Sequence, residues 1–346
     1  MNRNLSIAVV APPWFTVPPS GYGGIEAVCA DLVDGLVARG HRVALIAAGK
    51  SETKATEQHS SFESPQSLRI NETIVDAYHT ALADSVISGG KFDIVHDHTL
   101  AGPLLGRSRN IPTVSTIHSN LKGDYLAYFR EMSKWVALVA LSRGHQAASP
   151  DVTWTDYVYN GIRTADFPFR DRAEKEDWVL FLGRSTRAKG MDVAIDAARA
   201  AGRRIVLAAK CNEPPEKRYF EEHVRPRLGS DTEWLGEVGG AEKGELLAKA
   251  ACLVNPISWE EPFGLVMAEA MACGTPVVTY ARGAAPEVVE HGVTGYVNTS
   301  FDDLVASIDA ADSLSPKACR TRAVENFDMS VMVEKYERLY LRLLDS

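Results

Sequence analysis

The stretch WEEPFGLVMAEAMACGTPVV, residues 259–278, contains the strongest indication of how this chain folds. Pro262 cannot donate a backbone hydrogen bond, and it disfavours helix at the residue before it. We therefore predict a loop at Glu261 and a helix over Leu265–Ala272. Glu269 then projects from that helix about one turn further along. The segment predicts two carboxylates on either side of a turn that opens a small-residue helix.

The start of this helix is predicted to bind an anion. Its first amides have no partner within the helix, and the helix dipole favours negative charge at the same end. The residues near these amides are Phe263, Gly264 and Leu265. A carboxylate beside a bound phosphate is repulsive unless it accepts hydrogen bonds from hydroxyl groups. We therefore expect Glu261 to accept sugar hydroxyls and Glu269 to accept ribose hydroxyls, which predicts a nucleotide-sugar site.

A second segment, LFLGRSTRAKG at residues 180–190, supplies positive charge. An apolar run ends at Gly183 and is followed by Arg184, Arg187 and Lys189. Arginine grips phosphate through two parallel hydrogen bonds, whereas lysine acts as a compact charge. Together they could neutralise a diphosphate leaving group without a metal ion. On their own these residues fit a solvated surface equally well.

A third segment, GYGGIE at residues 21–26, follows the first apolar run and precedes a helical pattern. Glycine permits close approach of the backbone to an anion, so Gly23 and Gly24 are expected to contact the diphosphate. A glycine-rich turn after a strand is by itself an ordinary loop. The three segments together, in this order, favour the nucleotide-sugar site over separate structural roles.

These motifs resemble the retaining glycosyltransferases of family 4, which have the two-domain GT-B fold. The resemblance extends through FDIVHDH, STIH and VYNGI to GRSTRAKG and EEPFGLVMAEAMACGTPVV. It implies that Glu261 and Glu269 are the family's paired glutamates and that Arg184 and Lys189 bind the diphosphate. It also implies that His118, the histidine of the TxH motif, lies near the transferred sugar. The catalytic set implied is therefore His118, Arg184, Lys189 and Glu261.

The length and the order of patterns predict an α/β protein of two domains. A chain of 346 residues exceeds the usual size of one core. Apolar runs alternate with helical patterns, which is typical of parallel sheets with crossover helices. The resemblance implies two Rossmann-like, doubly wound domains that face each other across a cleft. We expect an acceptor domain over residues 1–168, a donor domain over 169–328, and a C-terminal helix over 329–346 that crosses back to the first domain.

Six strands are expected in the first domain and five in the second. The first set is 6–11, 42–47, 93–96, 113–117, 136–141 and 156–158, and the second set is 178–182, 204–209, 232–235, 252–256 and 275–279. Charge and proline density rise over residues 163–177, which we interpret as the interdomain linker.

Composition narrows the class of protein. The formal net charge of -8 disfavours a nucleic-acid binder and weakens a peripheral-membrane role. The five cysteines are dispersed and lack a CxxC spacing, so we expect neither a disulfide framework nor a zinc site. The apolar run near the N-terminus stops at Pro12 and is too short for a signal peptide or a membrane span. A cytoplasmic location is the expected default.

The function expected is transfer of a hexosyl unit from a nucleoside diphosphate sugar to an acceptor hydroxyl. Retention at the anomeric carbon follows from the resemblance, and uracil is the expected base. We expect no cofactor and no catalytic metal, with the nucleotide sugar as co-substrate. The expected acceptor is a small molecule or a saccharide, and a lipid acceptor is less favoured. The sequence indicates neither the sugar nor the oligomeric state.

Several alternatives stay open on the residues. A nucleotide-sugar epimerase, a phosphorylase or a non-catalytic sugar-nucleotide binder could share this architecture. An NAD-dependent oxidoreductase is disfavoured because the GxGG segment lacks the third glycine of the dinucleotide fingerprint.

His96 and His98 flank Asp97 and could suggest a metal site, although a third ligand is missing. Core packing is favoured over an acceptor platform for a group of aromatic residues. They are Tyr125, Tyr128, Phe129 and Trp135, while Trp14 is open to either role.

Overall fold

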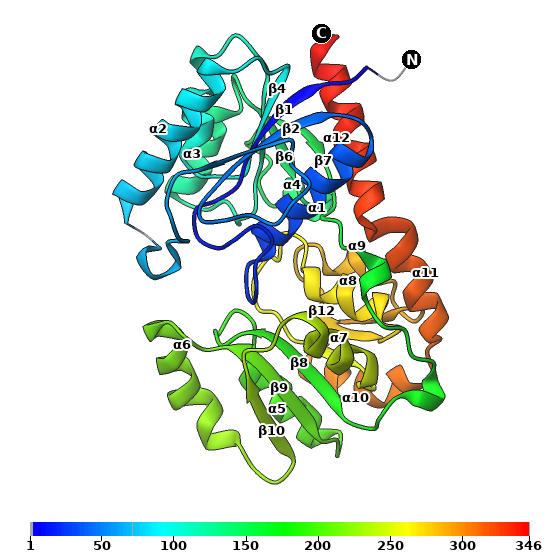
Figure 1. Cartoon of the computed structure of the whole chain (residues 1–346). Coiled ribbons are helices and arrows are strands. Elements are labelled where there is room, and N and C mark those ends of the chain that lie inside the picture. The colour runs from blue at the N-terminus through cyan, green and yellow to red at the C-terminus, as the bar shows by residue number, and fades with distance from the viewer. Residues whose placement is uncertain (1–2, 71, 346) are drawn as a thin grey trace. The chain divides into compact units, whose positions relative to one another are not determined.

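The computed structural model describes residues 3–70 and 72–345, and these form two compact units. The first unit ends at Gly161 and also contains the C-terminal segment from Met329, while the second spans Ile162–Asp328 (Figure 1). Each unit has its own parallel sheet with helices packed against it. The chain is thus an α/β protein with two Rossmann-like domains.

The first unit is built on a seven-stranded parallel sheet in the order β3-β2-β1-β4-β5-β6-β7. The order reverses at β1, so the sheet is doubly wound and the loops after β1 and β4 diverge at its carboxyl edge. The strands are β1 (Ser6–Val10), β2 (Arg42–Ala47), β3 (Glu57–Ser60), β4 (Ile94–Asp97), β5 (Thr113–Thr116), β6 (Ala137–Ala140) and β7 (Trp154–Tyr157). The helices are α1 (Gly24–Ala38), α2 (Thr73–Gly89), α3 (Asp124–Met132), α4 (Arg143–Ala147) and α12 (Met329–Leu344).

The second unit has a six-stranded parallel sheet in the order β10-β9-β8-β11-β12-β13. Its order reverses at β8, again the mark of double winding. The strands are β8 (Val179–Arg184), β9 (Ile205–Lys210), β10 (Thr232–Gly236), β11 (Leu253–Asn255), β12 (Val277–Tyr280) and β13 (Gly295–Asn298). The helices are α5 (Met191–Ala200), α6 (Pro214–Tyr219), α7 (Gly240–Lys249), α8 (Leu265–Ala272), α9 (Ala285–Val288), α10 (Phe301–Ala310) and α11 (Pro316–Phe327).

Every expected strand overlaps an observed one, and two further strands were missed. β3 reads EQHS, which has no apolar residue, and it is paired on one side only, at the edge of its sheet. β13 is also an edge strand of four residues, and it begins with a glycine. Edge strands need less apolar surface than central ones because one side faces no neighbour. Hydrophobic periodicity therefore gave no signal for either strand.

The boundary between the units lies at Gly161, whereas the sequence placed it after residue 168. The backbone N–H of Ile162 already donates to the carbonyl of Phe327, and Ile162 pairs with Asp328 in an isolated bridge. The expected linker is also packed onto the second unit. Lys175 Nζ donates to the Ala248 carbonyl at 2.8 Å and to Thr275 at 2.6 Å. These long-range contacts cannot be seen in local composition.

Helix α12 closes the first unit. It packs against α1 at a position where a side chain cannot fit, since a Cβ atom at Gly35 would lie 2.4 Å from Val333. Its buried Glu337 accepts hydrogen bonds from Arg39 and lies 3.0 Å from His41 Nε2.

Among the residues described, no helix combines the length and the apolar character that a membrane crossing would need.

Candidate functional site

The start of α8 is held rigidly by its own loop. Gly264 caps the helix with a φ of +87°, and a Cβ atom there would lie 2.4 Å from Met267. Phe263 is buried and packs edge-to-face on Phe327, with 5.5 Å between ring centroids. The loop after β12 braces the other side, because the N–H of Ala284 donates to the carbonyl of Glu261 at 2.8 Å. The first amides of α8 therefore have a fixed direction.

Glu261 is buried and is joined to two neighbours. Lys189 forms an ion pair with its Oε2 atom, and Trp259 Nε1 donates to the same oxygen at 3.0 Å. The Lys189 ammonium also lies 5.2 Å from the centroid of the Trp259 ring, which favours a cation over its face. The structure thus brings together Lys189 and Glu261, which are 72 residues apart in sequence.

Glu269 has a different cationic partner, which the sequence analysis did not identify. Lys243, on α7, donates to Glu269 Oε1 at 2.7 Å. The Lys243 ammonium lies 5.8 Å from the ring centroid of Phe167. Glu261 and Glu269 are therefore each paired with one lysine. Both carboxylates are mostly buried, so removal of either lysine would leave a buried charge without compensation.

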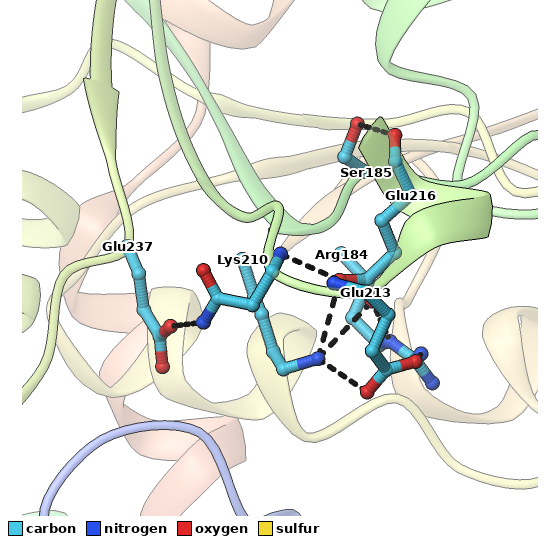
Figure 2. A network of polar contacts seen from close by, with 7 residues as sticks. Arg184, Ser185, Lys210, Glu213, Glu216 and Glu237 are labelled. Atoms are coloured by element: carbon cyan, nitrogen blue, oxygen red, sulfur yellow. Dashed lines mark hydrogen bonds and ion pairs between the residues drawn. The ribbon is translucent and has the colours of Figure 1, made fainter. Parts of the chain in front are cut away.

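Arg184 belongs to a larger polar network at the carboxyl ends of β8 and β9 (Figure 2). Its guanidinium donates to Glu216 at 2.7 Å and to Glu213 at 2.9 Å. Lys210, the register partner of Arg184 on β9, donates to the same two carboxylates. Glu213 and Glu216 form the capping box of α6, so the helix start holds both carboxylates in place.

The pairing within this network outweighs the cost of burial for Glu216. Its side chain is almost fully buried, and burial raises the pKa of a carboxyl group. Hydrogen bonds from Arg184 and from the backbone amides of Asn212 and Glu213 act in the opposite direction, and the pKa of Glu216 is lowered. Glu216 is therefore ionised at neutral pH and holds Arg184 in a defined position.

The cations of the second unit are divided between separate networks of carboxylates. The sequence predicts that Arg184 and Lys189 bind one diphosphate together, whereas in the structure each is bound to carboxylates of a different network. Lys210 and Lys243 are further cations beside these glutamates. Lys210 could have been suspected, because it ends a strand next to the one that carries Arg184. For Lys243, within an exposed helical pattern, the sequence offered no signal.

The glycine-rich segment lies in the first unit, at the start of α1. Gly23 caps the helix, and a Cβ atom there would lie 2.7 Å from Pro19, so only glycine fits. Gly24 is the first residue of α1. Glu26 follows in the first turn and is 2% exposed, and its Oε1 atom has no hydrogen-bond partner among the described residues. Burial raises the pKa of Glu26 to about 7, partly opposed by hydrogen bonds from the backbone.

His118 is partly buried and forms a pair with His98. The His98 Nδ1 and His118 Nε2 atoms are 2.9 Å apart, so one ring must donate to the other. Burial lowers the pKa of both imidazoles well below the ordinary value, and nearby imidazoles lower it further, His96 for His98 and His98 for His118. Both rings are therefore neutral at pH 7. His98 Nε2 makes no hydrogen bond to any of the described residues.

His96 has a structural role. Its Nδ1 atom lies 2.5 Å from the hydroxyl of Tyr340 and its Nε2 atom lies 2.8 Å from Thr116 Oγ1, so both ring nitrogens are occupied. The ring lies against that of His98, with centroids 4.2 Å apart and ring planes tilted by 31°. Because Tyr340 is on α12, His96 links the sheet to the C-terminal helix.

No cluster of three or more metal-ligating side chains was found in the two described segments, 3–70 and 72–345. That metal is not needed for catalysis stays a prediction.

The cysteines are all unpaired thiols, and four of the five are buried. Burial raises the pKa of Cys252, Cys273 and Cys319 to about 12, so these thiols are unreactive packing residues.

Two doubly wound α/β units, with the C-terminal helix returned to the first, define the GT-B class of glycosyltransferase. Comparison with known families agrees. A family described as glycosyl transferases group 1 matches residues 163–324, and one described as glycosyltransferase family 4 matches residues 22–165. The chain therefore belongs to the group 1 and family 4 glycosyltransferases and is an enzyme of that class.

Relatives and solved structures of this class are similar over nearly the whole chain. A phosphatidyl-myo-inositol mannosyltransferase of Mycobacterium leprae is 26% identical, with 97% of this chain and 96% of the relative covered. A glycosyltransferase involved in avilamycin A biosynthesis is 28% identical, with a TM-score of 0.74 and coverage of 99% and 98%. A sucrose-phosphate synthase from Thermosynechococcus elongatus has a TM-score of 0.83 at 18% identity, with coverage of 99% and 100%.

Proposed function

We propose that this protein transfers a hexosyl unit from a UDP-sugar to an acceptor hydroxyl, with retention at the anomeric carbon and without a catalytic metal. The observation that carries the proposal is the assembly of Lys189, Glu261 and Trp259 beside the start of α8. A lysine, a buried carboxylate and the first amides of a helix offer a diphosphate and a sugar the groups that each requires.

The second unit supplies the groups that would stabilise the leaving diphosphate. Negative charge develops on the diphosphate as the bond from the anomeric carbon to its oxygen breaks. Fixed cations lower the barrier because they need no reorganisation at that moment. Lys189 is fixed by Glu261, and Arg184 is fixed by Glu213 and Glu216. These carboxylates act as positioning groups that keep each cation in place before the donor arrives.

The sugar and the ribose would be bound by the glutamates. Glu261 takes sugar hydroxyls and Glu269 takes ribose hydroxyls, while each keeps its lysine partner. The amides near Phe263, Gly264 and Leu265 would bind phosphate oxygens. In the first unit, Gly23 and Gly24 present backbone to the diphosphate, and His118 contacts the transferred sugar. The acceptor oxygen forms the new bond on the face that the diphosphate leaves, and its proton passes to the leaving phosphate.

The base and the sugar of the donor are proposed from a protein of the same fold. A structure of the same fold, 19% identical with a TM-score of 0.74, is described in complex with UDP and glucose. Uracil is therefore the base that we propose, and UDP-glucose is the donor to test first. Relatives named as a mannosyltransferase and as a glycogen synthase differ in acceptor, so their names do not select one for this chain.

Substitution of Lys189 tests the proposal. We expect Lys189→Gln to lower kcat by roughly 10²- to 10³-fold, as loss of one transition-state hydrogen-bond donor does elsewhere. Glutamine can still donate to Glu261, but the buried carboxylate loses its cation, so the variant should be less stable than the wild type. Turnover is therefore compared at a temperature at which thermal unfolding shows that both proteins are folded. Turnover with UDP-glucose and a panel of other UDP-sugars is the measurement.

Lys217→Gln, at an exposed position of α6, is the matched control and should retain wild-type turnover. A thermal-shift panel of UDP, GDP and ADP measures donor binding separately from transfer. A Lys189→Gln variant with wild-type turnover, or a protein that UDP and its sugars do not stabilise, would overturn the proposal.

A further inference from the structure

The first unit contains a cavity of about 840 Å³ that lies at the carboxyl edge of its sheet. The loops after β1, β4 and β5 form its base, and α2 and α3 form its sides. Every residue that lines it belongs to the first unit, so the cavity is defined within one compact body. Its volume is within the range of small-molecule sites, about 300–1,000 Å³.

The wall of this cavity is mostly apolar. Its larger apolar side chains include Trp14, Ile25, Leu104, Leu105, Ile117 and Phe129. Leu104 and Tyr125, both on the wall, are 51% and 49% exposed, which leaves large apolar surface in contact with water. An apolar occupant would cover that surface and release the water, a favourable exchange. A sugar would cover this surface less favourably, because those of its hydroxyls that faced the apolar side chains would lose their hydrogen bonds to water.

The charge of the cavity also restricts its occupant. No lysine or arginine is among the described residues that line it, and Asp76 is the one carboxylic acid. Partial burial raises the pKa of Asp76 above its ordinary value. An anionic occupant, such as a phospholipid or a sugar phosphate, would find no counter-charge on the wall and would meet Asp76. The cavity therefore fits a neutral molecule.

One end of the cavity is polar, where His98 and His118 reach the wall. If the shared proton is on His98, its Nε2 atom is an acceptor, and if the proton is on His118, the His98 Nε2 atom must carry a hydrogen and donate. A hydroxyl group can satisfy either tautomer, because it both donates and accepts. An ether can only accept. A buried His98 Nε2 atom without a protein partner is thus suited to a hydroxyl.

We propose that this cavity binds the acceptor, and that the acceptor is a neutral small molecule with an apolar body and a hydroxyl that hydrogen-bonds to His98. That the bound molecule is the acceptor rests on the proposed function. Its chemistry is narrower than the small molecule or saccharide expected from the sequence. Three observations support this chemistry: the apolar wall of the cavity, the lack of cationic side chains among the described residues that line it, and the hydrogen bond between His98 and His118.

Matched ligands without any nucleotide test the chemistry of the cavity. The probes are 2-naphthol, 2-methoxynaphthalene, naphthalene-2-sulfonate and maltose, and binding is followed by calorimetry. We expect 2-naphthol to bind at least tenfold more tightly than its methoxy and sulfonate analogues, and maltose not to bind at the same concentrations. Equal or tighter binding of naphthalene-2-sulfonate or maltose would overturn the proposal.

A pair of variants tests the location. Ala81, on α2, is exposed and lines the cavity, so Ala81→Trp should fill part of it without disturbing the core. Ser88 is exposed on the same helix and does not line the cavity, so Ser88→Trp is the control. We expect Ala81→Trp to weaken 2-naphthol binding at least tenfold and Ser88→Trp to leave it unchanged. Unchanged binding in Ala81→Trp would overturn the location.

The same proteins separate this inference from the proposed function. UDP-glucose binding should be equal in the wild type and in both variants, because neither Ala81 nor Ser88 is among the groups proposed to bind the donor. In the presence of a UDP-sugar that binds, naphthyl glycoside should form in the wild type and at least tenfold more slowly in Ala81→Trp. Binding of 2-naphthol without donor binding would overturn the transfer but keep the cavity chemistry, and donor binding with no response to 2-naphthol would overturn this inference alone.

Discussion

Burial shifts the pKa of individual side chains in the first unit toward the neutral form. Burial raises the pKa of Asp97 to about 6, although hydrogen bonds from Thr99 oppose the shift. It raises that of Glu26 to about 7 and lowers those of His98 and His118. A charged group loses its hydration on burial, so each residue favours its neutral form. The second unit differs, because Glu216 stays ionised through its partners.

The raised pKa of Glu26 predicts a dependence of stability on pH. The folded state binds a proton between pH 4.5 and pH 7 that the unfolded state has released, so this contribution is present below pH 4.5 and is lost as the pH rises through 7. In Glu26→Gln the contribution is absent. The difference in free energy of unfolding between wild type and variant should therefore shift against the wild type by up to about 3 kcal/mol from pH 4.5 to pH 8.

Urea unfolding at several pH values measures that difference, and subtraction of the variant removes the contributions of all other groups. Glu325→Gln, at an exposed position, is the matched control and should follow the wild type at every pH. A constant difference between wild type and Glu26→Gln across this pH range would show that Glu26 is ionised in the folded protein.

At the scale of elements, the loop before α8 is set by a close contact with the loop after β12. Gly283 N–H donates to Glu260 at 2.7 Å. A Cβ atom at Gly283 would lie 2.2 Å from the carbonyl oxygen of Glu261, and its φ of +53° is in the left-handed region. The position of Glu261 and of the helix start therefore depends on a glycine 22 residues further along the chain.

Gly283→Ala should displace the Glu261 loop and lower both stability and donor binding. A side chain at positive φ costs roughly 1 to 2 kcal/mol by itself. Gly202→Ala carries that cost alone, since Gly202 has a φ of +69° with open space around it. We expect Gly283→Ala to lower the Tm further than Gly202→Ala and to weaken UDP-glucose binding at least tenfold. Equal effects of the two substitutions would show that the loop contact is unimportant.

At the scale of the whole molecule, buried histidines are confined to one unit. Five histidines, four of them buried and one partly buried, have a lowered pKa for which burial is the largest cause. They are His79, His96, His98, His118 and His145, all in the first unit. Below pH 6.5 the unfolded chain binds protons at these sites that the folded unit does not, so stability falls as the pH falls. The raised pKa values of Glu26 and Asp97 have the opposite effect, since they increase stability as the pH falls, but these two carboxyl groups are fewer than the five histidines.

The first unit should therefore lose stability in mild acid before the second. Each histidine contributes a slope of up to about 1.4 kcal/mol per pH unit between its unfolded and folded pKa values. Hydrogen exchange measured at pH 7 and at pH 5, with correction for the intrinsic rate, should show that β4 and β5 lose protection while β8 and β9 retain it. Earlier loss in β8 and β9 would contradict this prediction.

Much of the architecture could be predicted from the sequence because its signals are local. Central strands are continuous apolar runs, Pro262 separates the loop at Glu261 from α8, and α1 carries its apolar stripe at helical spacing. The paired glutamates, Arg184 and Lys189 were named from their motifs. The edge strands β3 and β13 escaped because an edge strand can be short or polar.

By itself the sequence determined the α/β class, the presence of two sheets and the residue types of a nucleotide-sugar site. Only the tertiary structure decided which charges meet: Lys189 with Glu261, Lys243 with Glu269, and Arg184 with the capping carboxylates of α6. It also decided that His98 and His118 share one proton beside an apolar cavity. The physical reason is that periodicity and turn chemistry act over a few residues, whereas ion pairs, burial and cavities arise where segments distant in sequence pack together.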